Sequence, residues 1–371
     1  MPRPRGHAAR RPGGRGRRVH RNRSAQRVQP RAEVSGRPGG RRLSFRSDRL
    51  SRRLTRRRRD VAAIAVIGEL NLDLIVTGAP RLPRPGEEVI VDGMQLTLGS
   101  SSAILAAQLA RLGDDVLFVS KVGADDFGRR ALEFCRACGV RTDAIAVDAS
   151  IATGLTISIA LGTERAQLTA MGSIQEMRFS DVDFSRLEGV RHVHISSFYL
   201  QRNLRPDVGR IFARARSMGL TTSLDTGWPH EGETNGDLES VWPHLDVFLP
   251  NEAEAMHLSG QATVDAALDV LAARVPLVVV KLGPAGAVAR RGDEIVRRAA
   301  FDVAVVDTTG AGDSFNGGFL HAYLAGAALP ECLDLANACG ALSTRGPGGT
   351  TTQPSLAEAE QFARAAVRRP Q

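Results

Sequence analysis

The sequence predicts an α/β fold in which a mostly parallel sheet is covered by helices on both faces. Two observations indicate this class. From residue 191 to residue 280, short apolar runs alternate with segments of helical periodicity and are joined by short connections. The apolar run 61–68 has the length of a buried strand and follows a stretch without apolar periodicity. A chain of 371 residues is long enough for one large domain of this type.

Residues 1–59 form a basic tail that differs in composition from the rest. Residues 1–60 hold 22 Arg against three acidic residues, a balance of +19, whereas the whole chain carries +9, so residues 61–371 carry −10. The tail is rich in Arg, Gly, Pro and Ser, and we expect it to be disordered. It could bind nucleic acid, target the protein, or be upstream sequence translated from a misassigned start. We favour the third interpretation.

Cysteine content and hydropathy predict a cytoplasmic protein. Four cysteines are too few for a disulfide scaffold, which favours a reducing compartment. Cys135 and Cys138 form a C-x-x-C without a second pair of zinc ligands, so we expect packed thiols there. No apolar run is long enough to span a bilayer, and we expect no membrane partner.

The first strand is followed by polar residues at the edge where open α/β sheets bind ligands. Asn71 and Asp73 lie two residues apart. In an extended segment this spacing puts both side chains on one face, where they could hold neighbouring hydroxyl groups of a polyol. By itself the pattern also fits an ordinary turn.

Two β segments interrupt the rhythm of strands and helices. Residues 88–98 alternate weakly like a strand, and residues 153–160 and 166–170 predict a hairpin. Between them, a helix with one apolar face ends at Gly113. Ser100, Ser101 and Ser102 stand at its start and could cap it or offer hydroxyl groups to a ligand.

Two later strand ends also carry polar residues. Asn251 and Glu254 are three apart at the start of a helix and so share a face. Lys281 follows the apolar run 277–280 and precedes the glycine turn of Gly283 and Gly286. Lys281 could reach a phosphate or face solvent.

Residues 305–319 predict a short apolar strand, a glycine turn and a helix that begins near Gly312. Gly310 and Gly312 leave backbone N–H groups open at the positive end of the helix dipole, so residues 310–312, Ala311 included, form a candidate anion hole. We expect Asp313 to stay ionised among these donors and to accept the proton of a substrate hydroxyl. Gly317 and Gly318 lie inside the helix, which predicts a close approach to its backbone.

The run Asp307-Thr308-Thr309-Gly310-Ala311-Gly312-Asp313-Ser314-Phe315 resembles the C-terminal signature of the PfkB (ribokinase-like) carbohydrate kinases. The resemblance covers residues 61–356. It implies a ribokinase-like domain over residues 60–371, with a small β lid from about 73–98 and 150–172. It also implies phosphorylation of a sugar or sugar-acid hydroxyl with ATP and Mg²⁺, and in some members with K⁺.

The resemblance also implies roles for individual residues. Those implied for the substrate are Asn71, Asp73, Gly99, Ser100, Ser101 and Asp313. Those implied for the nucleotide are Lys281, Gly283, Gly286, Thr309, Gly310, Gly312 and Asn337. Those implied for metals are Asn251 and Glu254 for Mg²⁺ through water, and Asp307 and Thr309 for K⁺. The chain departs from the family's N-terminal signature, because Ser100 replaces a Gly and Ile104 an Asn.

Two other functions stay open. An adenosine-type nucleoside kinase would keep the chemistry, but residues 61–112 contain no aromatic side chain that could stack on a base. A sugar-sensing regulator without activity could use the basic tail to contact nucleic acid, a partner we otherwise do not expect. The presence of Asp313 argues against this regulator. We expect a monomer or a homodimer.

Overall fold

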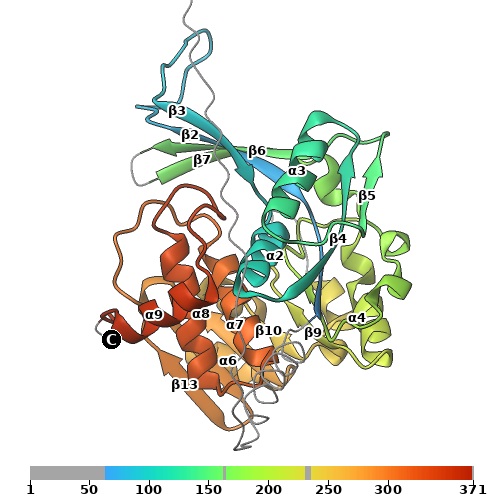
Figure 1. The fold of residues 1–371 in the computed structure, drawn as a ribbon. Helices are drawn as coiled ribbons and strands as arrows, with labels where there is room; N and C mark the ends of the chain where they lie inside the picture. The colour runs from blue at the N-terminus through green and yellow to red at the C-terminus, as the bar shows by residue number, and fades with distance from the viewer. Residues whose placement is uncertain (1–62, 162–163, 230–234, 370–371) are drawn as a thin grey trace, which may run out of the picture. The chain divides into compact units, whose positions relative to one another are not determined.

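The computed structural model describes residues 63–161, 164–229 and 235–369 (Figure 1). The basic tail and residues 61 and 62 of the predicted first strand lie outside them. The strands of the central sheet are β1 (Ala63–Ile67), β4 (Asp115–Gly123), β5 (Ile145–Asp148), β8 (His192–Ile195), β9 (Thr221–Leu224), β10 (Val247–Phe248), β11 (Leu277–Lys281), β12 (Ala287–Arg291) and β13 (Glu294–Arg298).

These strands lie in the order β13-β12-β11-β10-β9-β8-β1-β4-β5. The seven strands from β11 to β5 in this order pair in parallel with one another. Next to β11, β12 and β13 add an antiparallel edge. The predicted mostly parallel sheet is confirmed.

Helices cover both faces of this sheet. One layer holds α2 (Ser101–Leu112), α3 (Asp126–Ala137), α7 (Ala311–Leu324), α8 (Leu329–Ser343) and α9 (Leu356–Ala365). The other holds α4 (Val208–Ser217), α5 (Glu252–Ser259) and α6 (Val264–Ala272). In the central strand β1, Ile64 and Val66 pack into the first layer and Ala65 and Ile67 into the second. Burial on both faces explains why this segment is continuously apolar.

A second sheet has the order β3-β2-β6-β7 and comes from the segments in which the lid is predicted. Its strands are β2 (Asn71–Thr77), β3 (Gly93–Leu98), β6 (Gly154–Leu161) and β7 (Glu164–Ala170), grouped at the upper left of Figure 1. The predicted strand 88–98 is too long, because only residues 93–98 pair with β2. Ile90 is 79% exposed and has no sheet to pack on.

The glycines inside α7 let other helices approach it closely. A Cβ atom on Gly317 would lie 2.8 Å from Gln108 Cγ of α2, and one on Gly318 would lie 2.9 Å from Cys339 Sγ of α8. The predicted close approach is therefore made by neighbouring helices. This packing fixes the first turn of α7 relative to the sheet.

The predicted strand before α7 is wrong. Residues 302–305 have no regular structure, and Val305 and Val306 are 51% and 63% exposed. The N–H groups of Val306 and Asp307 both donate to the carbonyl of Thr344 at the end of α8, at 2.8 and 3.1 Å. The end of α8 therefore holds this segment in place. Val305 lines a cavity that is described below.

Cys135 is buried in α3, and burial raises the pKa of its thiol to about 12. It and Cys138, Cys332 and Cys339 are free thiols. Within residues 63–369, apart from the two undescribed gaps, no helix is long and apolar enough to cross a membrane.

Candidate active site

The first turn of α7 depends on a glycine at its N-cap. Gly310 has φ 70°, in the left-handed region, and a Cβ atom there would lie 2.8 Å from Gly349 Cα and 2.9 Å from Ile104 Cγ2. The turn therefore has no room for a side chain at this position. Two cavities meet at it: Thr309, Gly310 and Asp313 line one, and Ala311 and Gly312 line the other.

The first of these, the lid cavity, has a volume of about 620 Å³. It lies between the second sheet, β3-β2-β6-β7, and the loops that follow β1, β8 and β9 in the central sheet. Its lining residues are Glu69, Asn71, Asp73, Ser100, Ser101, Ile104, Thr156, Gln167, Thr169, Met171, Ile174, Ser197, Tyr199, Leu200, Arg202, Thr226, Gly227, Trp228, Thr309, Gly310 and Asp313. Asn71 and Asp73 of β2 and Asp313 of α7 make part of this wall polar.

Asn71 and Asp73 share one face of β2, as their spacing predicts. Asn71 Nδ2 donates to Asp73 Oδ1 at 3.2 Å, and both residues line the lid cavity. Gly99 does not line the cavity. A Cβ atom on it would lie 2.2 Å from Asp73 Oδ1 and 2.7 Å from Asn71 Nδ2, so Gly99 makes room for this pair.

The three serines at the start of α2 have different partners. Ser100 caps the helix by accepting from the N–H of Ala103 at 3.1 Å, and its hydroxyl donates to the Glu69 carbonyl at 2.6 Å. Ser102 is buried and donates to Glu69 Oε2 at 2.7 Å. Ser101 lines the cavity and hydrogen-bonds Asp313. Of the three hydroxyls, that of Ser101 is the best placed for a ligand.

Asp313 is surrounded by other carboxyl groups. Burial, together with the negative charges of Asp225 and Glu69, raises its pKa to about 7 against the lowering effect of Lys281. The sequence predicts that Asp313 stays ionised, whereas burial and its acidic neighbours hold its pKa well above the usual value of an aspartate. The sequence argument considered only the helix dipole and omitted the neighbouring acids.

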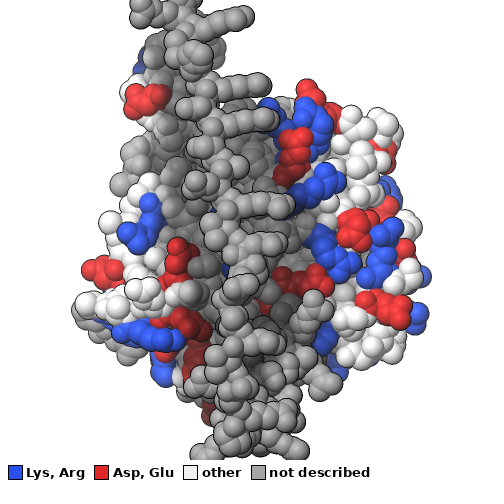
Figure 2. Space-filling view, in the orientation of Figure 1, with Lys and Arg blue, Asp and Glu red and all other residues white. Residues whose placement is uncertain are grey.

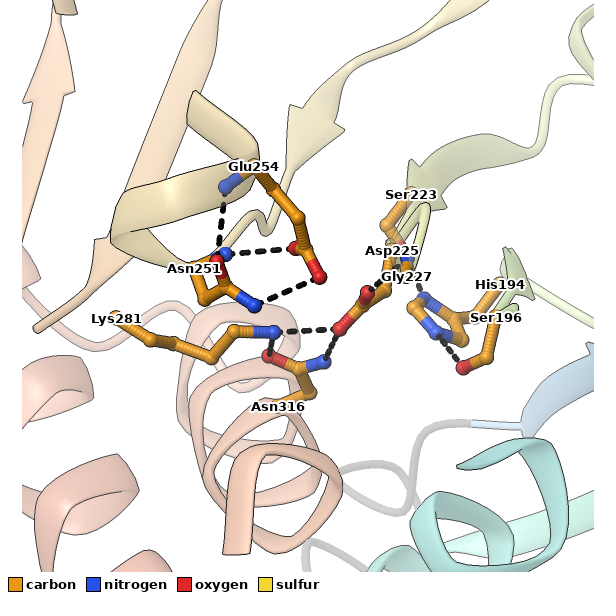
Figure 3. A network of polar contacts seen from close by, with 9 residues as sticks. All are labelled: His194, Ser196, Ser223, Asp225, Gly227, Asn251, Glu254, Lys281 and Asn316. Atoms are coloured by element: carbon orange, nitrogen blue, oxygen red, sulfur yellow. Dashed lines mark hydrogen bonds and ion pairs between the residues drawn. The ribbon is translucent and has the colours of Figure 1, made fainter. Parts of the chain in front are cut away.

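Lys281 belongs to a polar network beside the start of α7, and only 12% of its side chain is exposed (Figure 3). Its Nζ lies 2.5 Å from Asp225 Oδ2 and donates to Asn316 Oδ1 at 3.4 Å. Asn316 Nδ2 donates to Asp225 Oδ2 at 2.5 Å. Lys281 therefore does not face solvent. A Cβ atom on Gly312 would lie 3.8 Å from Nζ, so the ammonium group is beside the first turn of α7.

Asn251 and Glu254 form a capping box at the start of α5 (Figure 3). Glu254 N–H donates to Asn251 Oδ1 at 2.9 Å, and Asn251 Nδ2 donates to Glu254 Oε1 at 2.7 Å. Burial and the negative charge of Asp225 together raise the pKa of Glu254 to about 7. The two residues share a face, as predicted.

The second cavity, the apolar cavity, has a volume of about 250 Å³. Lys281, Gly283, Gly286 and Gly312 line it, together with apolar residues that include Phe301, Val303, Val305 and Ala341. Asn337 also lines it, and its Nδ2 donates to the carbonyls of Arg298 and Ala299 at 3.3 and 3.4 Å. Thr309 and Gly310, which the family resemblance implies for the nucleotide, line the lid cavity.

Asp307 organises the loop before α7. Its Oδ1 accepts from the N–H and the hydroxyl of Thr309 at 2.9 and 2.7 Å, and its Oδ2 accepts from the N–H of Gly348 at 2.8 Å. These bonds join the loop to the segment after α8.

The pfkB family carbohydrate kinase profile matches residues 61–356. The chain belongs to the pfkB family of carbohydrate kinases. It is 28% identical to the ribokinase of Haemophilus influenzae over 309 residues, which cover 81% of this chain and 97% of the ribokinase. It is 29% identical to an ATP-dependent ribose-1-phosphate kinase of Halopiger xanaduensis, over 78% of this chain and 93% of that one.

The fold is that of pfkB kinases as well. A solved structure described as a putative ribokinase II of E. coli in complex with ATP and Mg²⁺ matches with a TM-score of 0.74 and 26% identity. The match covers 82% of this chain and 99% of the other. The predicted family, the ribokinase-like fold and the assignment as an ATP-dependent sugar kinase are confirmed.

Sequence reasoning missed several residues of this pfkB site. Glu69, Arg202, Tyr199 and Trp228 line the lid cavity, and Asp225 pairs with Lys281. For Asp225 a signal existed, because it is an acidic residue directly after a predicted strand. The same signal existed for Glu69, which directly follows the predicted strand 61–68, whereas Arg202, Tyr199 and Trp228 lie in loops whose course is set by tertiary contacts.

Proposed function

We propose that this sugar kinase transfers the γ-phosphoryl group of ATP to a hydroxyl group of a sugar or sugar acid held in the lid cavity. The position of Asp313 carries the proposal. Asp313 lines the lid cavity, and its neighbours Ala311 and Gly312 line the apolar cavity. A hydroxyl group in the first cavity and a phosphate from the second would therefore meet at the first turn of α7.

Asp313 acts as the general base. It takes the proton of the substrate hydroxyl as that oxygen bonds to the γ-phosphorus, and the bond from this phosphorus to ADP breaks with its electron pair leaving on ADP. Asn71 and Asp73 hold the acceptor so that one hydroxyl group faces Asp313. Positioning and stabilisation of charge supply most of the catalysis.

The anion hole is the first turn of α7. Helix geometry leaves the N–H groups of a first turn without partners inside the helix. The N–H of Ala311 donates to the Thr308 carbonyl at 3.2 Å, so we assign the phosphate oxygens chiefly to the N–H groups of Gly312 and Asp313. Lys281 beside Gly312 adds a positive charge to this anion site.

The apolar cavity takes the adenine end of ATP. Phe301, Val303 and Val305 provide walls for a flat ring, and Gly283 and Gly286 leave the backbone open beside it. In this proposal Asn337 shapes the wall by holding the carbonyls of Arg298 and Ala299.

Asn251 and Glu254 are the residues that would hold Mg²⁺. Within the described residues no group of three acidic, His or Cys side chains could hold a metal alone. One carboxylate with an amide fits Mg²⁺, which keeps several waters and takes its other ligands from ATP phosphates. Bound there, Mg²⁺ would neutralise charge on the phosphates.

Potassium activation is a separate part of the proposal. Asp307 and Thr309 would contribute oxygen ligands to K⁺ in the loop before α7. A rate that is equal in KCl and NaCl would contradict it.

Two further properties belong to the proposal. The four free thiols fit a reducing, cytoplasmic location. Ile90, Met94 and Leu168 are exposed apolar residues of the lid region, which fits a homodimer as well as a monomer. Light scattering of the purified chain measures this state.

A nucleoside kinase is the second candidate function, and one observation favours it. Tyr199 and Trp228 line the lid cavity, so aromatic side chains for a base come from outside residues 61–112. This observation removes the main sequence argument against a nucleoside.

The regulator without activity has less support. On the face drawn in Figure 2, acidic and basic side chains are interspersed over the described residues. Nucleic-acid binding would therefore rest on the basic tail, which lies outside the described residues.

The test is ADP release by the full chain with Mg²⁺ and ATP across a panel of acceptors. The panel contains ribose, fructose, 2-keto-3-deoxygluconate, tagatose 6-phosphate and adenosine. Turnover with a sugar or sugar acid supports the proposal, and turnover with adenosine alone supports the second candidate. Binding of ATP without turnover of any acceptor would contradict both.

A further inference from the structure

The charges in the lid cavity are unequally distributed. Among its described lining residues, three carry a carboxyl group, namely Glu69, Asp73 and Asp313. Arg202 is the one cationic side chain of this lining. Asn71 and the carboxyl groups already provide the acceptors and donors that sugar hydroxyl groups need. A guanidinium group adds the ability to bind an anion.

The loop that carries Arg202 is held firmly in place. Ser197, a few residues before it, has φ 51°, a left-handed conformation that is rare outside glycine and is often retained at functional sites. Gln201 is buried, and its Nε2 donates to the Ser196 carbonyl at 2.5 Å. The N–H groups of Leu204 and Arg205 donate to the Gln201 carbonyl at 3.0 and 2.8 Å. The backbone on both sides of Arg202 is therefore fixed, while its side chain is exposed at the cavity wall.

The cavity also has room for more than a sugar ring. Its volume of about 620 Å³ lies well within the range of cavities that enclose drug-sized ligands. Burial raises the pKa of Glu69, so this carboxyl group opposes an incoming anion less than a fully ionised carboxylate would. A cavity of this volume can hold a sugar together with an anionic substituent.

We propose that the acceptor of this kinase carries an anionic group, a carboxylate or a phosphate, and that Arg202 binds this group. The inference rests on the proposed function, since it names the substrate class of the same site. A guanidinium group suits both anions, because its planar fork donates two parallel hydrogen bonds to either. Arg202 is thus a specificity residue on the wall of the lid cavity.

The test compares neutral and anionic acceptors in matched pairs with the full chain. The pairs are ribose with ribose 5-phosphate, fructose with fructose 6-phosphate, and 3-deoxyglucosone with 2-keto-3-deoxygluconate. We expect kcat/KM to be at least about tenfold higher for the anionic member of one pair. A higher kcat/KM for the anionic member of either of the first two pairs would identify a phosphate. The same preference in the last pair would identify a carboxylate.

Variants of Arg202 assign the preference to its side chain. In Arg202→Ala we expect KM for the anionic acceptor to rise about tenfold to a hundredfold, with kcat and the KM of the neutral acceptor little changed. Arg202→Lys should keep part of the preference, because it keeps the charge but loses the fork. Arg129→Ala is the matched control, since Arg129 lies on α3 and pairs with Asp126 and Glu133.

A binding measurement separates this inference from the proposed function. We expect the anionic acceptor to raise the Tm of the wild-type chain and of Arg129→Ala but not that of Arg202→Ala. A neutral sugar that is phosphorylated best, with unchanged kinetics in Arg202→Ala, would overturn the inference and leave the sugar kinase intact. If no acceptor is phosphorylated, the proposed function fails. The inference fails with it unless the anionic acceptor still raises Tm through Arg202.

Discussion

The two cavities that meet at the first turn of α7 differ in what their walls are made of. The charged and polar side chains that line the lid cavity come from β2, β6, β7, α2, α7 and the loops after β1, β8 and β9. The apolar cavity is lined chiefly by glycine backbone and aliphatic or aromatic carbon, with Lys281 at the end next to α7. In the proposed function the apolar cavity takes the adenine end of ATP, so the side chains of the lid cavity are the ones that would select the acceptor.

The largest effect should come from Asp313, the proposed base, which lines the lid cavity next to Ala311 and Gly312 of the apolar cavity. We expect Asp313→Asn to lower kcat by about 10²- to 10⁴-fold, because an amide cannot accept the hydroxyl proton. Asp126→Asn, at an exposed carboxylate of α3 paired with Arg129, should keep normal turnover and serves as the control. ADP release measures both, and near-normal turnover of Asp313→Asn would refute the assignment of the base.

The stability of Asp313→Asn should depend on pH differently from that of the wild-type chain. The pKa of Asp313 in the folded chain is about 7, above its usual value, so its protonated form stabilises the fold and this contribution is lost as pH rises towards 7. Asp313→Asn lacks the buried negative charge. Its Tm should therefore equal or exceed that of the wild type at pH 8.

A substitution of Lys281 tests its proposed role beside the apolar cavity and its contribution to the polar network with Asp225 and Asn316. Lys281→Met leaves the buried Asp225 without its cation, which should lower the free energy of unfolding by about 3–5 kcal/mol and raise KM for ATP. Urea denaturation measures the first effect, and a second substitution, Asp225→Asn, should restore part of the loss. The control is Lys121→Met, which breaks the Lys121–Asp181 pair outside both cavities and should leave KM for ATP unchanged. Equal effects on KM in both variants would contradict the role of Lys281.

Two glycines of α7 separate an effect on the anion site from an effect on packing. In Gly312→Ala the new methyl group would lie 3.8 Å from Lys281 Nζ, so we expect unchanged stability but lower turnover, because the methyl group crowds the phosphate. In Gly318→Ala it would lie 2.9 Å from Cys339 Sγ, which should cost about 1–3 kcal/mol of stability with KM unchanged. Thermal unfolding and steady-state kinetics measure the two effects, and the reverse pattern would show that Gly312 serves packing.

The smallest expected effect is a shift of the pH profile. Because Asp313 must be ionised to accept a proton, kcat/KM should rise with pH and level off above about pH 7. Glu69→Gln removes one of the charges that raise this pKa, so its profile should move to lower pH. A profile that stays flat between pH 5.5 and 8 would contradict an ionisable base with this pKa.

The part of the site that could be predicted from sequence is the part made by residues close together in the chain. Asn71 and Asp73 share a face because a strand alternates every residue, and the turn at Gly310 follows from glycine spacing before an apolar helix. Residues 305–307 show the limit of such reasoning. Val305 and Val306 favour a strand locally, but the N–H groups of Val306 and Asp307 donate instead to the carbonyl of Thr344 at the end of α8.

The sequence alone determined the alternation of strands and helices, the position of the glycine turn and the place of Asp313 in it, because each depends on local periodicity and backbone geometry. Only the tertiary structure decided that Lys281 pairs with Asp225, that Asn316 bonds the same carboxylate, and that Arg202 lines the lid cavity. These contacts join residues from different strands, helices and loops. Which of them become neighbours is set by the order of strands in the sheet and by packing between layers. The ionisation of Asp313 follows from the same neighbours, since burial and two other carboxyl groups set its pKa.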